Sequence, residues 1–180
     1  MGEMPTQAAS KRASDTGWIS PEPTRPMRHS KSGCDLDWPA MSFHDRQMAT
    51  FIAGLIERFY GELWNRWNDA AVDDTLSPAF RFRGSLGRET LGRQGWRQYR
   101  DLVHAGSADF RNEIVELVCE GERAAARLRY TGTHTGLLAG LPATQRRFDY
   151  AGAAFFSADH RWLTSAWVLG DLDGLRAQLG

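Results

Sequence analysis

Lysine is nearly absent from this chain. Lys11 and Lys31 are its only lysines, and both precede residue 41. A Schiff base or a lysine general base requires this amine. We therefore do not expect either kind of catalysis from the rest of the chain.

Cysteine and long apolar runs are also scarce. Cys34 and Cys119 are the only cysteines, and a pair separated in this way is a poor disulfide framework, so we expect two free thiols. No apolar run approaches the roughly 20 residues that span a bilayer, and the first residues lack the charged-then-apolar pattern of a signal peptide. We expect a cytoplasmic protein that does not enter a membrane.

Several motifs that identify common enzyme classes are missing. The sequence has no Gly-x-Ser-x-Gly elbow, no phosphate-binding loop and no Gly-x-Gly-x-x-Gly after a strand. Its five histidines have no metal-ligand spacing, and we expect no metal: His29, His44, His104, His134 and His160. Basic and acidic residues number 22 each, without a basic stripe, so a nucleic-acid partner is not expected.

The composition divides the chain near residue 40. Residues 1–40 hold five of the seven prolines, together with much serine and threonine. Such a segment buries too little apolar surface to offset the entropy lost on ordering. We interpret residues 1–40 as a disordered or loosely attached tail and residues 41–180 as one domain.

Helical patterns come first in this domain. Ser42 to Asp45 has the form of a capping box, and apolar residues then recur every three or four positions: Met48, Ile52, Leu55, Phe59 and Leu63. These features predict a long helix ending near Trp67-Asn68. A helical turn over 69–76, a short strand around 80–82 and a helix over 92–104 are predicted to follow.

Strand patterns fill most of the remainder. Alternating segments bounded by turn residues predict strands over 111–119, 123–133, 147–157 and 162–169, followed by a C-terminal helix over 172–179. Short connections favour antiparallel neighbours. Helices followed by a bent meander indicate an α+β fold, in which a curved antiparallel sheet wraps around the N-terminal helices as a cone-shaped barrel.

Two residues are candidates for acid/base chemistry. His134 lies between two glycines where a strand runs into a loop, and imidazole titrates near neutrality. Its alternative role is to hold the loop by hydrogen bonding. Asp171 follows the last strand and is either a pocket carboxylate or the N-cap of the C-terminal helix.

Aromatic residues are candidates for a binding cavity. An aromatic wall favours a planar apolar ligand, although aromatic side chains in a curved sheet also serve simply as core. The candidates from this pattern are Trp96, Tyr99, Tyr130, Tyr150 and Phe155.

Three segments resemble a known family. Gly132-Thr133-His134-Thr135-Gly136, Gly140-Leu141-Pro142-Ala143 and the terminal Gln178-Leu179-Gly180 are similar to motifs of the SnoaL-like polyketide cyclase, or ester cyclase, family. The likeness runs in order from about Met48 to Gly180. That family belongs to the cone-shaped superfamily named after nuclear transport factor two, so the resemblance implies this fold.

The resemblance also implies an activity. It implies a cofactor-free homodimeric enzyme, of the lyase or isomerase class, in which acid/base groups of an apolar pocket promote intramolecular aldol closure of an aromatic or polyketide-like small molecule. Aligned on the terminal Gln-Leu-Gly, Val168 stands where characterised cyclases carry an acid/base aspartate, and Ala166 where they carry a histidine. His134 then becomes the candidate acid/base group, with Asp171 as its orienter or as the base.

The resemblance adds three residues to the predicted substrate-binding set, namely Tyr60, Phe82 and Val168. The apolar residues at 82, 166 and 168 support a second hypothesis, a non-catalytic ligand-binding or assembly module that has lost the cyclase carboxylate. We expect the dimer to pack through the outer face of the sheet, around Leu117, Trp162 or Trp167.

Overall fold

The computed structural model describes residues 42–180. The predicted tail over 1–40, with Lys11, Lys31 and Cys34, lies outside the described residues. Within the part that is described, no helix is long and apolar enough to cross a membrane.

The domain begins with a capped helix, α1 (Phe43–Arg58), that continues into a π-helical segment, η1 (Phe59–Trp64). The backbone N–H of Asp45 donates to Ser42 Oγ over 3.1 Å, and the Asp45 carboxylate accepts from the Ser42 backbone, which confirms the predicted capping box. The wide turn is closed by a hydrogen bond from Asn65 N–H to the Tyr60 carbonyl. Such segments are rare and frequently accompany functional sites.

A short linking region leads to the second long helix. It contains η2 (Asp69–Ala71), α2 (Val72–Thr75), β1 (Leu76–Arg83) and β2 (Glu89–Leu91), and ends at α3 (Gly92–Gly106). Strand β1 is longer than predicted, and β2 was not predicted at all. A strand of three residues shows no alternation that a sequence pattern can reveal.

The remaining strands form the meander that the sequence predicts. They are β3 (Arg111–Glu120), β4 (Arg123–Thr133), β5 (Arg147–Ala158) and β6 (Leu163–Gly170), followed by α4 (Leu172–Leu179). Consecutive strands pair antiparallel, and the sheet order is β2-β1-β6-β5-β4-β3. The β1–β6 pair is parallel, which makes the sheet mixed, because the whole meander returns the chain to β1 in the same direction.

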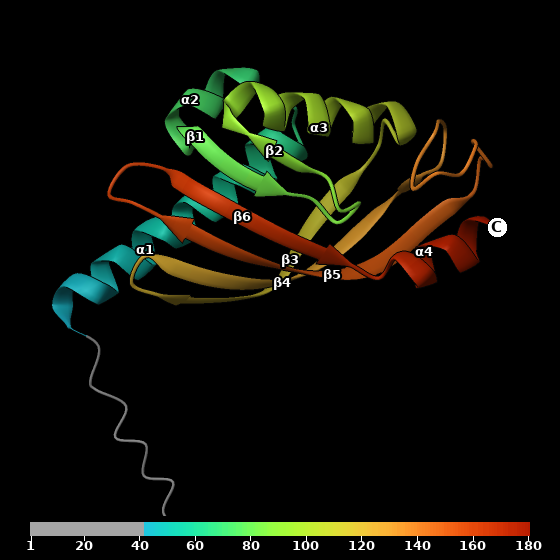
Figure 1. The fold of residues 1–180 in the computed structure, drawn as a ribbon. Coiled ribbons are helices and arrows are strands. Elements are labelled where there is room, and N and C mark those ends of the chain that lie inside the picture. The colour runs from blue at the N-terminus through green and yellow to red at the C-terminus, as the bar shows by residue number, and fades with distance from the viewer. Residues whose placement is uncertain (1–41) are drawn as a thin grey trace, which may run out of the picture. The chain divides into compact units, whose positions relative to one another are not determined.

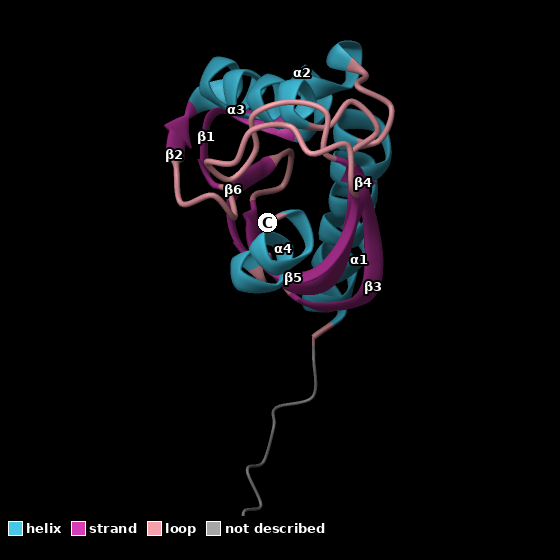
Figure 2. Ribbon diagram, turned by 90° about the vertical axis from the view of Figure 1, so that its right-hand side faces the viewer, coloured by secondary structure: helices cyan, strands magenta, loops and turns pink. Residues whose placement is uncertain are grey.

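The six strands form a curved sheet that does not close on itself, with helices packed against its concave side (Figure 1). The view along the domain in Figure 2 shows the strands curving around the interior, with α3 above them and α4 at the near end. This arrangement confirms the predicted α+β cone. Along each long strand, buried residues alternate with exposed ones, so one face of the sheet supplies the core.

Cross-strand pairing places one asparagine and two tyrosines in a single row on the concave face. Asn112 pairs with Tyr130 across β3 and β4, and Tyr130 pairs with Tyr150 across β4 and β5. The next row contains Leu128 and two glycines, Gly152 and Gly170. Large rings in one row therefore lie beside a row that is partly without side chains.

Candidate functional site

The concave face, η1 and α3 enclose a cavity lined mainly by aromatic side chains. The volume of the cavity is ≈ 30 Å³. That is room for roughly two water molecules. The cavity is narrow, so a ligand must be flat or displace side chains. Its walls are Phe59, Tyr60, Trp64, Phe82, Gly84, Ser85, Leu86, Tyr99, Val103, Phe110, Asn112, Tyr130, Leu138, Tyr150 and Val168.

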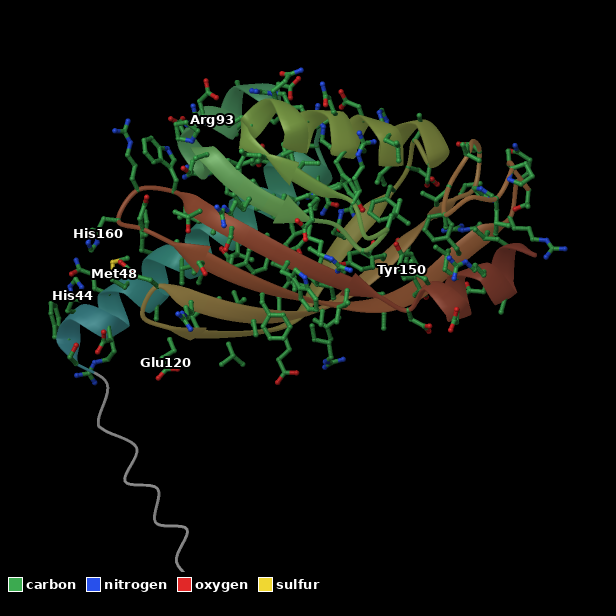
Figure 3. All side chains as sticks on the ribbon, viewed as in Figure 1. His44, Met48, Arg93, Glu120, Tyr150 and His160 are labelled. Atoms are coloured by element: carbon green, nitrogen blue, oxygen red, sulfur yellow. The ribbon has the colours of Figure 1, made fainter. Side chains whose placement is uncertain are left out.

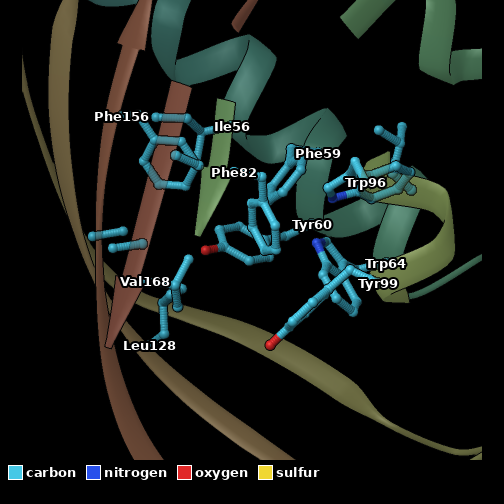
Figure 4. Packing of buried hydrophobic residues seen from close by; sticks show 14 of the residues in the cluster. Ile56, Phe59, Tyr60, Trp64, Phe82, Trp96, Tyr99, Leu128, Phe156 and Val168 are labelled. Atoms are coloured by element: carbon cyan, nitrogen blue, oxygen red, sulfur yellow. The ribbon is translucent and has the colours of Figure 1, made fainter. Parts of the chain in front are cut away.

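All four tyrosines of the chain lie in these walls. They come from different elements: Tyr60 from η1, Tyr99 from α3, and Tyr130 and Tyr150 from neighbouring strands. Figure 4 shows Tyr60, Trp64 and Tyr99 close together, with Val168 on the strand across from the Tyr60 hydroxyl. The fold therefore collects every phenol of the protein at one place.

Three polar atoms in this cavity have no hydrogen-bond partner outside their own group. They are the hydroxyls of Tyr60 and Tyr130 and the indole N–H of Trp64, all three from side chains at least 95% buried. Tyr99 differs, because its hydroxyl accepts a hydrogen bond from the Leu86 backbone N–H over 3.3 Å. Buried polar groups are nearly always paired, so three unpaired ones in a single cavity require an explanation.

Burial keeps these phenols neutral. It raises the pKa of Tyr60 and of Tyr130 far above the usual range, and an interaction between the two hydroxyls lowers the pKa of Tyr60 and raises the pKa of Tyr130. Burial likewise raises the pKa of Tyr150 and of Tyr99, although hydrogen bonding opposes part of this increase. Near neutral pH all four hydroxyls are therefore protonated.

Of the eight predicted binding residues, six line the cavity: Tyr60, Phe82, Tyr99, Tyr130, Tyr150 and Val168. The structure does not bring the other two to it. Trp96 is fully buried in the core behind the wall, with its ring 5.9 Å from that of Trp64. Phe155 points to the outer face, because its neighbours Ala154 and Phe156 point inward, and its ring is 6.0 Å from that of Trp167.

His134 is fully buried beside the end of β4 and does not line the cavity. Its Nδ1 lies 3.0 Å from Thr144 Oγ1, its backbone N–H donates to the Arg146 carbonyl, and its carbonyl accepts from Gln145 N–H. Its Nε2 has no partner. These contacts hold the β4–β5 loop, which is the structural alternative considered for this residue, and its acid/base role stays a prediction.

Asp171 is the N-cap of α4. Its carboxylate accepts a hydrogen bond from the Gly174 backbone N–H over 2.9 Å, and the residue is exposed. Within residues 42–180 no hydrogen bond joins it to His134. The capping role allowed by the sequence is therefore present, and the catalytic role stays a prediction.

The other histidines lie elsewhere. The rings of His44 and His160 are 6.0 Å apart at the end of the domain where α1 begins, far from Tyr150 in Figure 3. His104 stacks on Trp67 at 3.8 Å. Over residues 42–180 no group of three or more His, Cys, Asp or Glu side chains is arranged to hold a metal ion.

Several wall residues were not predicted from the sequence. Trp64 carried a usable signal, since it lies four positions after Tyr60 in a helical pattern and so shares its face. Asn112 gave none, because its place opposite Tyr130 depends on strand register. The wall as a whole contains no Asp, Glu, His, Lys or Arg. No side chain of the wall can therefore take up a proton near neutral pH.

Comparisons with known proteins agree with this fold. The sequence model of the family described as SnoaL-like polyketide cyclase matches residues 54–179. A structure from Jannaschia sp. assigned to the same family has a TM-score of 0.67 at 16% identity, covering 78% of this chain and 96% of that one. TsrD from Streptomyces laurentii has a TM-score of 0.64 at 27% identity, covering 73% and 96%.

A third solved structure, a SnoaL-like polyketide cyclase from Agrobacterium tumefaciens, has a TM-score of 0.60 at 23% identity. The superposition covers 70% of this chain and 98% of that one. A search of curated proteins finds no match. The structural matches extend over nearly the full length of each of the three proteins.

Proposed function

The chain belongs to the SnoaL-like polyketide cyclase family, and from this premise we propose that its cavity binds a flat, largely apolar small molecule and acts on it as a cofactor-free cyclase- or isomerase-like enzyme. The observation that carries the proposal is the convergence of all four tyrosines with apolar side chains on one narrow cavity. Aromatic walls bind planar ligands, and a few polar groups among them orient such a ligand.

The reaction that we propose is an intramolecular aldol closure. A proton leaves the carbon beside a carbonyl, the resulting enolate carbon bonds to a second carbonyl carbon of the same molecule, and that carbonyl oxygen takes up a proton. The neutral phenols of the wall cannot accept the first proton near pH 7. The predicted acceptor is His134, which does not itself line the cavity but lies at the start of the β4–β5 loop that supplies Leu138 to the wall.

A specific observation favours the alternative of a non-catalytic binding module. The wall contains no carboxylate or imidazole, and Val168 lines the cavity on β6, at the position where the family resemblance expects an aspartate. An apolar wall cannot transfer protons. In this alternative the ligand is held without being changed.

The experiment is incubation of the purified chain with a panel of polyketide methyl esters and related aromatic acids, followed by chromatography and mass analysis. Ring closure gives a product of equal mass with a new retention time, or of lower mass after loss of water. The first prediction is that wild type forms such a product and that His134→Ala abolishes it. Bound but unaltered ligand would contradict the enzyme proposal and support the alternative.

Asp171 allows a matched pair of variants. Asp171→Asn keeps a side chain able to cap α4 but removes the carboxylate, whereas Asp171→Ala removes both. If the carboxylate participates in the reaction, both variants lose turnover. If Asp171 only caps the helix, Asp171→Asn retains turnover and Asp171→Ala alone loses about 0.5–2 kcal/mol of stability.

If wild type proves inactive, Val168→Asp tests why. This substitution restores a carboxylate to the wall at the position that the family resemblance indicates. Turnover gained by this variant would show that the scaffold lacks only its proton acceptor. If this variant binds its ligand but leaves it unaltered, the result favours a binding module whose other wall residues have also diverged.

A further inference from the structure

The unpaired polar atoms of the cavity share one property. The indole N–H of Trp64 donates hydrogen bonds and never accepts them, and the hydroxyls of Tyr60 and Tyr130 keep their protons. All three side chains line the same cavity; the two hydroxyls interact with each other, and no further protein group accepts a hydrogen bond from the three. A buried donor without an acceptor destabilises a fold. A ligand that enters this cavity, in place of the roughly two waters it can hold, is therefore expected to supply an acceptor for these donors.

The charge of the wall restricts the ligand further. No Lys, Arg or His lines the cavity. Arg83 follows the wall residue Phe82 on β1, but its guanidinium lies over the Trp167 ring on the outer face, 5.0 Å from the ring centroid. Burying a carboxylate without a cation is strongly unfavourable. The acceptor atom therefore belongs to a neutral group, and a carbonyl oxygen has two lone pairs that accept from two donors at once.

The two hydroxyls are brought together by distant parts of the chain. Tyr60 is directed inward by the π-helical turn of η1, and Tyr130 by its pairing with Asn112 and Tyr150 in the sheet. The Tyr130 ring lies against Gly152, where an added Cβ would be 2.3 Å from Tyr130 Cε2. The Tyr60 ring packs edge-to-face on Phe59 and Phe156, so both rings have neighbours that hold their hydroxyls in place.

We propose that Tyr60 and Tyr130, with the Trp64 indole beside them, form a donor site for the carbonyl oxygen of a neutral planar ligand, and that this site selects ketones, quinones and esters against free carboxylates. The inference rests on the proposed function, because it specifies the ligand of the same cavity. It requires only binding and does not depend on turnover.

The test uses two probes of nearly the same shape and one anionic probe. 1-Indanone carries a carbonyl, indane lacks it, and indane-1-carboxylate is charged. Binding of each to the full chain is measured by calorimetry or by NMR titration. Wild type is expected to bind 1-indanone roughly fivefold to tenfold more tightly than indane for each donor engaged, and the carboxylate more weakly than 1-indanone.

The variants Tyr60→Phe and Tyr130→Phe remove each hydroxyl and keep its ring. Each is expected to weaken 1-indanone binding roughly fivefold to tenfold and to leave indane binding unchanged. Because the hydroxyls interact with no protein group other than each other, both variants are expected to melt close to the wild-type temperature. A structural role of the hydroxyls would lower the melting temperature and weaken both probes equally.

Three results would overturn the donor site: no binding of 1-indanone, equal binding of 1-indanone and indane, or equal losses for both probes in the Phe variants. Tighter binding of the carboxylate would overturn the selection for neutral groups. If the donor-site test fails but a polyketide ester is still converted, the proposed function is unaffected. Selective indanone binding without turnover of any ester supports the donor site and the non-catalytic alternative.

Discussion

At the scale of single residues, three of the four cavity tyrosines lie directly on a glycine. A Cβ added at Gly84 would be 2.0 Å from Tyr99 Cζ, one at Gly152 would be 2.3 Å from Tyr130 Cε2, and one at Gly170 would be 3.0 Å from Tyr150 Cε2. Real Cβ atoms do not approach other atoms as closely as the first two distances. The missing side chains therefore give the phenol rings their places in the wall.

Substitution of Gly152 tests this arrangement. In Gly152→Ala the new methyl group meets the Tyr130 ring and, at 2.7 Å, the Leu169 carbonyl oxygen, which cannot move easily. We expect a loss of about 1–3 kcal/mol in the free energy of unfolding, measured by urea denaturation, together with altered ligand binding. The matched control is Gly54→Ala on α1, where nothing lies within 4 Å of the added Cβ. It should stabilise by about 0.5–1 kcal/mol, and similar effects of the two variants would contradict the close packing.

The tyrosines also predict the response to alkaline pH. Burial raises the pKa of all four above its ordinary value of about 10. Their contribution to stability is fully present below pH 10 and is lost as the pH rises toward the folded-state pKa values. Absorbance at 295 nm should therefore show tyrosinate only when the near-ultraviolet circular dichroism of the native state is also lost. A phenol that ionises near pH 10 in the native protein would contradict the enclosed cavity.

At the scale of elements, α3 is tied to the segment before β1 by guanidinium groups. Arg93 donates to the carbonyl oxygens of Leu76 and Asp73, each over 2.8 Å. Arg100 is only 5% exposed, lies between the rings of Trp67 and Trp96, and donates to Asp69 over 2.8 Å. These bonds hold η2 and α2 against the helix that supplies Tyr99 and Val103 to the cavity.

The bond between Arg100 and Asp69 predicts a dependence on acidic pH. Hydrogen bonding from Arg100 holds the pKa of Asp69 below its usual value, about 3.9 in the unfolded chain. The stability that this carboxylate contributes is present above that value and is lost as the pH falls through the folded-state pKa. Asp69→Asn should therefore melt at a lower temperature than wild type at pH 7, and the difference should shrink toward pH 2. A constant difference across this range would contradict the assignment.

At the scale of the whole domain, the outer face of the sheet carries exposed apolar residues. Register aligns Val118, Ala125, Phe155 and Trp167 in one row across four strands, and Leu169 lies beside it. Phe155 and Val118 are 52% and 62% exposed. Of the residues expected at a dimer interface, only Trp167 belongs to this row. Leu117 packs against the core, and Trp162 donates its indole N–H to the Asp73 carbonyl.

This row is the surface on which we expect a second copy of the chain to pack, since contiguous apolar patches on a sheet usually mark an interface. Sedimentation velocity at micromolar concentration should show a dimer for wild type and a monomer for Phe155→Arg. Leu137→Ser is the control, because Leu137 is 70% exposed but lies in the β4–β5 loop. A monomeric wild type, or a dimeric Phe155→Arg, would contradict the interface.

The local elements of this domain could be read from the sequence with few errors. The capping box at Ser42, the bounds of β4 and the C-terminal helix after Asp171 all follow from contacts within a few residues. The π-helical turn was not predicted, since Phe59, Leu63 and Trp64 have spacings that suit an α-helix equally well. Strand β2 was missed because it is short, and the parallel β1–β6 pair because nothing local encodes it.

By itself, then, the sequence determined the order of the long helices and strands, because periodicity and capping depend on near neighbours, and its motifs indicated the family to which the chain belongs. Only the tertiary structure decided that Phe155 faces outward, that Trp96 lies behind the wall and that Asp171 caps a helix. It alone also decided that the donors of Tyr60, Trp64 and Tyr130 share a cavity in which no other protein group accepts from them. Whether a buried group is paired depends on atoms contributed by distant parts of the chain, and that pairing exists only once the sheet has curved around the helices.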